Sequence, residues 1–346
     1  MEVQQMKPLQ IGGRLVGVGY PCYIIAEAGI NHNGDLDLAK KLVAAAAEAG
    51  ADAVKFQTHI PEKEMMQNTV TADYVGEPLF DLLKRVELSR QDHIELMEYA
   101  AGKGILFLST PFSREAADLL EEIGVVAYKI GSGEMTNLPL LEHVAGKKKP
   151  VIISTGMSTL EEIEGSVNFL KKLGCGFMLL HCTSTYPTNY EDINLNVMGH
   201  LRERFVVPVG LSDHSTGIYV ALASVALGAC LIEKHFTLDR DLPGPDQKSS
   251  ITPEELAELV RGVRAVEKAM GSVKRVTEGE LPIQKMARES VVSLVDIPAG
   301  TVIGESMVWV KRPGGGIPAK DLYRVIGMRA REDIRANTLI NWSDLQ

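Results

Sequence analysis

The sequence has few cysteines and no long apolar run. Its four cysteines, Cys22, Cys175, Cys182 and Cys230, form no CxxC pair, the spacing that zinc knuckles and dithiol redox centres use. No apolar run approaches the roughly 20 residues that span a bilayer, and the polar residues 1–8 lack the hydrophobic core of a secretory signal. We therefore expect reduced, mostly buried thiols in a cytoplasmic protein that makes no membrane contact.

Positive charge is also scarce. The 346 residues include 36 Lys and Arg against 45 Asp and Glu, which gives a net charge of -9. Binding to nucleic acid needs clustered positive charge, so we expect no nucleic-acid partner. The composition, 45% hydrophobic and 23% charged, is that of a folded globular chain. A small anionic substrate held by a few local lysines, hydroxyls and backbone N–H groups remains compatible with this charge.

Short β-rich runs alternate with helical segments along the first 270 residues. The candidate strands are Tyr23–Ala26, Ala53–Phe56, Ile105–Leu108, Ala127–Ile130, Val151–Ile153, Phe177–Leu180, Val207–Leu211 and Cys230–Glu233. A segment with helical periodicity follows each strand; one example is 252–270, which begins with the capping residue Thr252 and with Pro253. Eight such units predict an α/β fold, a (β/α)8 TIM barrel. A doubly wound open sheet is less favoured because no G-x-G-x-x-G follows the first strand.

The end of the chain differs in texture from the barrel region. Residues 271–283 contain Gly271, Gly279 and Pro282, which are typical of a linker. Beyond them, β runs alternate with Gly-rich turns. We expect a catalytic barrel over 1–270, a linker over 271–283 and a small β-rich domain over 284–346. The long loop 60–78 after the second strand predicts a substrate lid or an interface element.

Polar or charged residues follow all eight predicted strands. In TIM barrels the catalytic groups come from these carboxyl ends of the strands, so the pattern favours an enzyme over a binding module. One group of residues supplies ammonium and hydroxyl donors: Lys55, Lys129, Ser132, Ser154 and Ser212. Together with exposed backbone N–H groups of the loop 131–133, they predict a site for a phosphate or a carboxylate.

Two histidines form a second candidate group. His214 and His235 end the seventh and eighth strands, which are neighbours in a barrel. Two imidazoles and a carboxylate such as Glu27 suit a divalent ion such as Mn²⁺ with open water positions; the alternative is a pair of hydrogen-bonded structural histidines. Further candidates are His32, His59 and His181. The histidines on predicted helices, which we expect at the surface, are His93, His143 and His200.

An ordered series of motifs resembles the N-acetylneuraminate (sialic acid) synthase family. The motifs are Ile25–Gly34, Lys55–His59, Ser109–Ser113, Lys129–Glu134, Ser154–Met157, His181–Thr183, Tyr186-Pro187, Ser212–His214, Glu233–Phe236 and Gly244–Asp246. The part from about Ser290, with Lys311-Arg312-Pro313, resembles the antifreeze-protein-like (β-clip type) domain of these enzymes.

The resemblance implies a transferase, N-acetylneuraminate synthase. Such an enzyme condenses phosphoenolpyruvate with N-acetylmannosamine, an N-acylated mannosamine, and gives a nine-carbon 2-keto acid and phosphate by C–O cleavage. The resemblance also implies a divalent metal ion, with Mn²⁺ preferred over Mg²⁺ or Co²⁺. It further implies a homodimer in which the C-terminal domain of one chain covers the barrel of its partner.

Carried over motif by motif, the resemblance assigns roles to individual residues. The metal ligands would be His214 and His235. The residues that bind phosphoenolpyruvate would be Lys129, Ser132, Ser154 and Ser212, with Thr110, Ser184 and Lys55 nearby. The sugar and the reaction centre would be lined by Glu27, Gln57, Tyr186, Glu134 and Asp246, and Arg312 would reach in from the partner chain. Glu27 or Glu134 would accept the proton of a reacting water, or would instead support a ligand or a sugar hydroxyl.

Two other interpretations stay open. A legionaminic or pseudaminic acid synthase would use a 6-deoxy diacetamido hexose in the same chemistry. Residues 233–239 are shared with the legionaminic branch, whereas Thr58-His59, 62–65 and Ser113-Arg114 resemble the N-acetylneuraminate enzymes more. The other interpretation is a non-catalytic sugar-binding barrel, and the complete set of lysines, serines and paired histidines argues against it.

Overall fold

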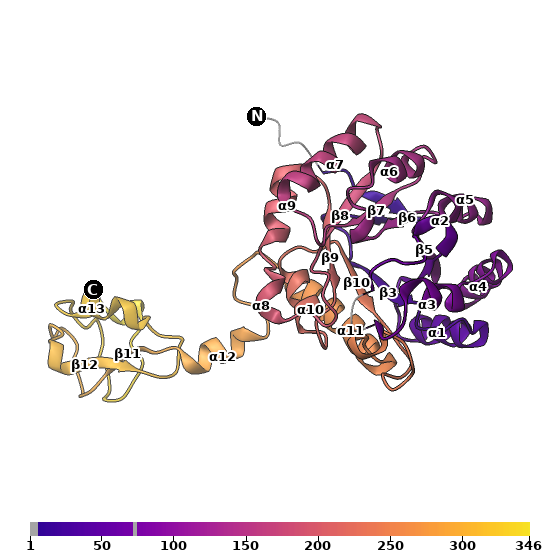
Figure 1. The fold of residues 1–346 in the computed structure, drawn as a ribbon. Coiled ribbons are helices and arrows are strands. Elements are labelled where there is room, and N and C mark those ends of the chain that lie inside the picture. The colour runs from indigo at the N-terminus through magenta and orange to yellow at the C-terminus, as the bar shows by residue number, and fades with distance from the viewer. Residues whose placement is uncertain (1–5, 72–74) are drawn as a thin grey trace. The chain divides into compact units, whose positions relative to one another are not determined.

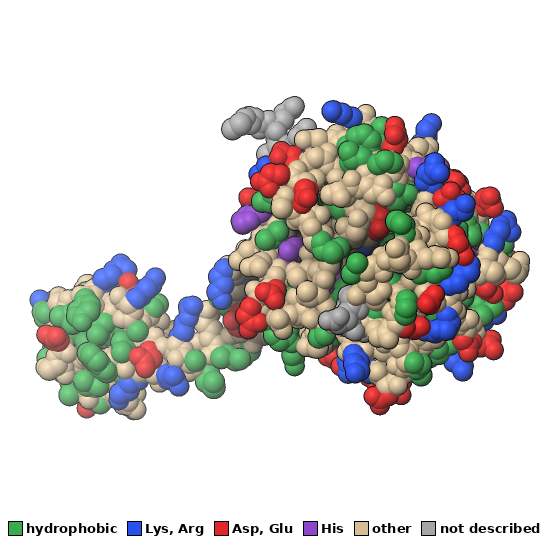
Figure 2. Space-filling view, in the orientation of Figure 1, with side chains coloured by type: hydrophobic (Ala, Val, Ile, Leu, Met, Phe, Trp, Pro, Cys, Tyr) green, Lys and Arg blue, Asp and Glu red, His purple; other side chains and the backbone are tan. Residues whose placement is uncertain are grey.

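The computed structural model describes residues 6–71 and 75–346. It divides the chain into two compact units, one that ends at Met270 and one from Gly271 to Gln346. In the first unit, parallel strands curve into a barrel with helices around its outside (Figure 1). Acidic and basic side chains are interspersed over the face of this unit that Figure 2 shows. Within the described residues, no helix is both long and apolar enough to cross a membrane.

The barrel has eight strands, as the sequence predicts. They are β3 (Tyr23–Gly29), β4 (Ala53–Thr58), β5 (Leu106–Pro111), β6 (Tyr128–Ile130), β7 (Val151–Ser154), β8 (Phe177–Cys182), β9 (Val209–Asp213) and β10 (Leu231–His235). Their order is β5-β4-β3-β10-β9-β8-β7-β6, and every pair in it is parallel. The end strands β5 and β6 lie next to each other, so the barrel is nearly closed. The predicted TIM barrel is confirmed.

Helices connect the strands on the outside. The longer ones are α1 (Leu36–Glu48), α4 (Arg90–Lys103), α5 (Arg114–Ile123), α6 (Leu138–Ala145), α7 (Leu160–Lys172), α9 (Val197–Phe205), α10 (Tyr219–Ala226) and α11 (Pro253–Ala269). The predicted start of α11 is present as a capping box, in which Thr252 and Glu255 satisfy each other's backbone N–H. Gly50 follows α1 with φ +83°, a conformation that glycine adopts without steric cost.

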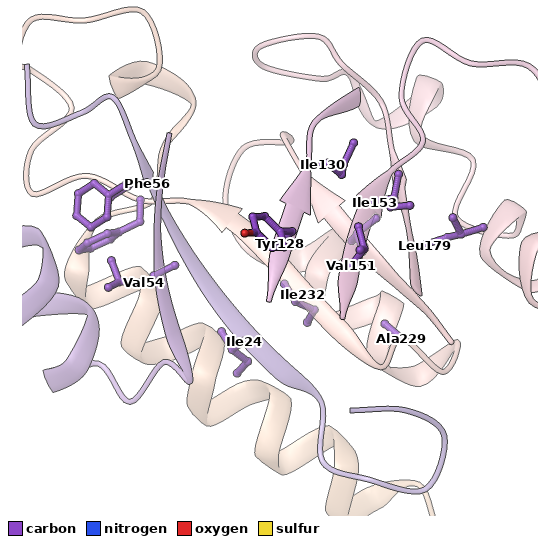
Figure 3. Packing of buried hydrophobic residues seen from close by; sticks show 14 of the residues in the cluster. Ile24, Val54, Phe56, Tyr128, Ile130, Val151, Ile153, Leu179, Ala229 and Ile232 are labelled. Atoms are coloured by element: carbon purple, nitrogen blue, oxygen red, sulfur yellow. The ribbon is translucent and has the colours of Figure 1, made fainter. Parts of the chain in front are cut away.

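Each barrel strand contributes to two apolar layers because successive side chains point to opposite faces. The outward layer packs under the helices and includes Ile24, Val54, Phe56, Ile130 and Ile153 (Figure 3). The inward layer fills the barrel from its amino-terminal end; its members include Ile25, Ala53, Leu108, Ile152, Leu180 and Leu231. All four cysteines are free, and Cys22, Cys182 and Cys230 are buried, so most of them lie in the interior, as expected.

A hairpin that the sequence analysis missed closes the amino-terminal end of the barrel. It consists of β1 (Leu9–Ile11) and β2 (Arg14–Val16), paired antiparallel. Leu9, Ile11 and Val16 belong to the inward apolar layer. The hairpin therefore excludes water from the barrel interior at the end opposite to the carboxyl ends of the strands.

The second unit is small and rich in β structure and turns. It contains α12 (Glu280–Ala287), the antiparallel pair β11 (Ser290–Ser293) and β12 (Val308–Lys311), and the short helix α13 (Leu322–Val325). Its own apolar core includes Val291, Ile303, Val308, Ile317 and Ile340. Because α12 begins at Glu280, the last residues of the segment expected as a linker are helical.

Candidate active site

The inward positions of the barrel strands change from apolar to polar toward their carboxyl ends. On β3, Ile25 is followed two residues later by Glu27, and on β4, Ala53 is followed by Lys55. The residues that continue the inward rows of the other six strands are Thr110, Lys129, Ser154, Cys182, Ser212 and Glu233. Because side chains on a strand alternate between its two faces, these inward residues lie together at the carboxyl ends of the strands.

Two lysines and two glutamates form a buried charge cluster at this end. Lys55 Nζ lies 2.7 Å from Glu27 Oε2 and 3.6 Å from Glu233 Oε2. Lys129 Nζ lies 3.4 Å from Glu233 Oε1. All four side chains are at most 6% exposed. We call these four residues the charge quartet; with two positive and two negative charges it balances itself.

The pKa values within the charge quartet follow from burial and pairing. Burial raises the pKa of Glu27 to about 7, although Lys55 opposes it. Burial also acts to raise the pKa of Glu233, but Lys129 and Lys55 outweigh it and the pKa falls. Burial lowers the pKa of Lys129, whereas the two glutamates overcome burial at Lys55 and raise its pKa. Lys129 is therefore the quartet's lysine that gains most from a bound anion.

Hydroxyl groups surround the lysines of the charge quartet. Lys129 Nζ donates to Ser154 Oγ at 2.7 Å, and Lys55 Nζ donates to Thr110 Oγ1 at 2.8 Å. Ser212 Oγ donates to Glu233 Oε1 at 3.0 Å. The structure thus brings together most of the residues predicted to bind an anion.

Ser132 and Ser184, the other two predicted hydroxyls, meet at Gly156. The Gly156 N–H donates to Ser132 Oγ at 3.1 Å. A Cβ at position 156 would collide with Ser184 Oγ and Ser132 Oγ, so any larger residue here would displace both hydroxyls. Cys182 Sγ lies 3.5 Å from Ser132 Oγ and 3.7 Å from Ser184 Oγ.

His214 and His235 are adjacent, with ring centroids 5.3 Å apart. His214 Nδ1 lies 2.9 Å from the Thr183 carbonyl oxygen and donates to it, so that in the neutral ring Nε2 carries the lone pair. His235 Nδ1 is buried without a hydrogen-bond partner in the described part of the chain, and Asp246 Oδ2 lies 3.7 Å from it. Burial and the neighbouring His214 hold the pKa of His235 well below its ordinary value.

These observations test whether the histidine pair fits a metal ion. A neutral imidazole with an unused nitrogen at His235, beside an oriented imidazole at His214, is a suitable pair of donors for a mid-series divalent ion. No group of three or more His, Cys, Asp or Glu residues with ligand spacing occurs among residues 6–71 and 75–346. A metal ion held by these two imidazoles would keep its other positions open to water and substrate.

A buried ion pair fixes the backbone next to both histidines. Lys234 Nζ donates to Asp213 Oδ2 at 2.8 Å and to the Ser215 carbonyl oxygen at 2.5 Å. Asp213 Oδ1 accepts from the N–H of Ser215 at 2.9 Å and from its hydroxyl at 2.7 Å. Since Asp213 precedes His214 and Lys234 precedes His235, these bonds tie the ends of β9 and β10 together.

A cavity of about 340 Å³ lies at the carboxyl ends of the strands. Its polar lining comprises Gln57, His59, Glu64, Glu134, Tyr186, His235 and Asp246. Its apolar lining includes Ile30, Met65, Val75, Leu79, Leu82 and Leu83, which cluster around α3 (Leu79–Val86). Residues of the loop expected as a lid therefore form one wall, although positions 72–74 lie outside the described residues.

Two carboxyl groups in this lining have raised pKa values. Burial raises the pKa of Glu134 to about 7 and that of Asp246 to about 6. Glu134 Oε2 is buried and has no hydrogen-bond partner within the described residues. Tyr186 packs its ring 4.2 Å from that of His214, centroid to centroid. Glu134, Asp246 and Tyr186 thus line the same cavity.

Arg312 belongs to the second unit, directly after β12, and is exposed. Other residues lie elsewhere than expected. His93 is buried, which contradicts the surface position expected for it: its Nε2 contacts Thr58 Oγ1 on β4 at 2.9 Å. His181 also has a structural role, because its Nε2 lies 2.5 Å from the Ile193 carbonyl oxygen. Glu233, which joins both lysines, was absent from the predicted site.

Comparisons with known proteins give separate matches for the two parts of the chain. A model described as the NeuB family matches residues 42–275, and a SAF domain model matches residues 288–346. The chain belongs to the NeuB family. N,N'-diacetyllegionaminic acid synthase of Legionella pneumophila is 43% identical to it over 95% of this chain and 96% of that protein.

Two further proteins are similar to this chain over most of its length. N-acetylneuraminate-9-phosphate synthase of Homo sapiens is 39% identical over 92% of this chain and 90% of that protein. The crystal structure of the N-acetylneuraminic acid synthetase of Leptospira borgpetersenii superimposes with a TM-score of 0.74 at 39% identity and covers 81% of this chain and 96% of that one. These relatives are named as sugar-acid synthases, and they differ in the product they are named for.

Proposed function

We propose that this NeuB family protein condenses phosphoenolpyruvate with an N-acylated hexose and forms a nine-carbon 2-keto acid and phosphate. The observation that carries the proposal is the buried charge quartet with its surrounding hydroxyls. The adjacent pair His214 and His235 and a cavity of about 340 Å³ lie at the same end of the barrel. A small polyanion and a neutral sugar are the pair of substrates that these two neighbouring regions accommodate.

Phosphoenolpyruvate binds at the lysines and hydroxyls in this proposal. Its phosphate and carboxylate give Lys129 negative partners in addition to Glu233, which offsets the burial that lowers the pKa of this lysine. Ser154 already contacts the Lys129 ammonium, and Ser132 and Ser184 present two hydroxyls around Gly156. Several fixed donors hold the enol in one orientation toward the cavity, which lowers the entropic part of the barrier.

The bond changes then balance as follows. C3 of phosphoenolpyruvate forms a C–C bond to the aldehyde carbon of the open-chain sugar, whose oxygen becomes a hydroxyl. Water adds to C2, and phosphate leaves with the bridging oxygen by C–O cleavage, so the oxygen of the water becomes the 2-keto oxygen. Of the two protons that this water loses, one balances the new hydroxyl on the former aldehyde carbon and the other leaves on the phosphate. A carboxylate must take a proton of that water. Glu134 and Glu27 are the candidates, because burial places the pKa of each at about 7.

The histidine pair would hold a divalent metal ion, for which we propose Mn²⁺. His214 would bind through Nε2, and the unused Nδ1 marks His235 as the second donor. The ion supplies Lewis-acid polarisation of an aldehyde oxygen when bound. Asp246 and Tyr186 line the cavity beside the pair and are placed to hold sugar hydroxyls. Arg312 would act in the barrel of a partner chain.

For the acceptor we favour a 6-deoxy diacetamido hexose, which gives a legionaminic acid, over N-acetylmannosamine. A relative with this named product is 43% identical, against 39% for the human N-acetylneuraminate-9-phosphate synthase. The cavity supports the same choice because α3 gives it an apolar wall, and a methyl group fits such a wall better than a hydroxyl. The gain is about 1–3 kcal/mol, so discrimination is only about 10- to 200-fold.

Phosphate release from phosphoenolpyruvate with Mn²⁺ tests the proposal when N-acetylmannosamine, the 6-deoxy diacetamido hexose and no sugar are run in parallel. We expect release with both sugars, a higher kcat/KM for the 6-deoxy sugar, and loss of release with a chelator. A preference for N-acetylmannosamine would keep the reaction and reverse the acceptor. No release with any sugar from folded, metal-loaded protein would contradict the proposed reaction and favour a sugar-binding barrel.

A further inference from the structure

A chain of hydrogen bonds connects the cavity wall with the charge quartet. Glu64, on the short helix α2 (Pro61–Glu64), places Oε1 2.8 Å from His59 Nδ1. His59 Nε2 lies 3.0 Å from Gln57 Oε1, and Gln57 Nε2 donates to Glu27 Oε1 at 3.2 Å. Glu27 in turn pairs with Lys55. His59 and Glu64 have no role in the reaction as proposed above.

The donors and acceptors along this chain determine the hydrogens on His59. An ionised carboxylate only accepts, so His59 Nδ1 donates to Glu64. The Gln57 amide points its NH2 group at Glu27, and its carbonyl oxygen therefore faces His59 Nε2. That nitrogen must also donate. Both ring nitrogens of His59 thus face acceptors, Glu64 at Nδ1 and Gln57 at Nε2, and His59 and Glu64 form a buried pair.

The opposite orientation of Gln57 shows why this pair matters. With the amide reversed, its carbonyl oxygen would face Glu27 Oε1, and two acceptors would meet unless Glu27 carried a proton. Its NH2 group would then face a bare nitrogen of His59. The state of His59 and the orientation of Gln57 are thus linked to whether Glu27 is a carboxylate.

The surroundings of His59 hold it in place for such a role. The His59 and Glu64 side chains are 6% and 4% exposed, respectively. The His59 ring stacks on Phe112 with centroids 4.3 Å apart and planes at 15°. Glu64 also accepts from the Ile60 N–H at 3.4 Å. A buried ring with a fixed plane and a carboxylate partner has little freedom to turn away from Gln57.

We propose that the His59–Glu64 pair is a positioning device that fixes the Gln57 amide with its NH2 toward Glu27 and so keeps Glu27 a charged acceptor in the reaction centre. The role assigned to Glu27 rests on the proposed function. Because α2 also forms part of the cavity lining through Glu64, the device makes the orientation of Gln57 depend on the position of this wall.

Two variants test the proposal through turnover. His59→Phe keeps an aromatic ring for Phe112 but removes both ring nitrogens, and Glu64→Gln replaces the carboxylate that His59 Nδ1 contacts. We expect kcat to fall about 10- to 100-fold in both, with KM for phosphoenolpyruvate changed less than about threefold, since the lysines and serines are untouched. The control is His143→Phe, which breaks a more exposed histidine–carboxylate pair, between His143 on α6 and Asp118, and should leave kcat unchanged.

The ¹⁵N NMR signals of the His59 ring provide a readout that does not depend on turnover. We expect two protonated nitrogens in the full chain at neutral pH and one bare nitrogen in Glu64→Gln. One bare nitrogen in the unmodified protein would overturn the proposal, as would an unchanged kcat in His59→Phe. If the unmodified protein turns over no sugar, the proposed function has failed, and the NMR signals still decide whether His59 orients Gln57.

Discussion

Replacing Glu233 by Gln removes the carboxylate that joins both lysines of the charge quartet. At 3.4 Å and 3.6 Å from the two ammonium nitrogens, each attraction amounts to about 5 kcal/mol at an effective dielectric constant of roughly 20. Desolvation offsets part of this, and breaking one side of a buried ion pair costs about 3–5 kcal/mol. Lys129 suffers most, because burial already lowers its pKa.

We therefore expect Glu233→Gln to lower the melting temperature by roughly 10 °C, at about 2–4 °C per kcal/mol. Calorimetry of the same variant should show weaker binding of phosphoenolpyruvate, because a deprotonated Lys129 no longer attracts it. The matched control combines Lys129→Met with Glu233→Gln and leaves no unpaired ammonium. It should recover at least half of the lost stability but no turnover. A melting temperature of Glu233→Gln within 3 °C of the unmodified protein, an order-of-magnitude threshold, would refute the reasoning.

Three other predictions concern the metal, Glu134 and the second unit. His235→Ala should weaken Mn²⁺ binding at least about 100-fold, measured by calorimetry without substrates; unchanged affinity would remove this residue as a ligand. Because burial raises the pKa of Glu134 to about 7 from 4.5, the native protein binds this proton more tightly than the unfolded chain, and its stability falls by about 3 kcal/mol as pH rises through that window. Urea denaturation at pH 5 and pH 8 should show that Glu134→Gln loses this dependence. An equal change in the free energy of unfolding between the two pH values in the variant and the unmodified protein would contradict the assignment. Arg312→Ala should raise KM for the sugar and leave KM for phosphoenolpyruvate unchanged, whereas full activity would exclude Arg312 from the site.

Most of the barrel could be predicted from the sequence because its strands are buried on both faces. Such strands are short apolar runs between helices, as in Val151–Ser154. The hairpin of β1 and β2 was missed because strands of three residues carry no readable period. Its apolar residues cover the open end of the barrel, so their role is apparent only once the barrel has formed.

The site was predictable where one strand alone determines it. The alternation along β3 and β4 places Glu27 and Lys55 inside the barrel whatever surrounds them. Glu233 also lies in such a row, but its two lysine partners come from β4 and β6, and that meeting depends on barrel closure. The burial of His93 could have been inferred, since Leu96 and Ala100 continue its face of α4 at helical spacing.

The most direct test of the central claim follows the bridging oxygen of phosphoenolpyruvate. The protein is incubated with Mn²⁺, the 6-deoxy diacetamido hexose and phosphoenolpyruvate that carries ¹⁸O at the bridging position, and both products are analysed by mass spectrometry. The account predicts equal amounts of a nine-carbon 2-keto acid and phosphate, with the ¹⁸O in the phosphate. Pyruvate in place of the keto acid, or ¹⁸O retained in the organic product, would contradict it.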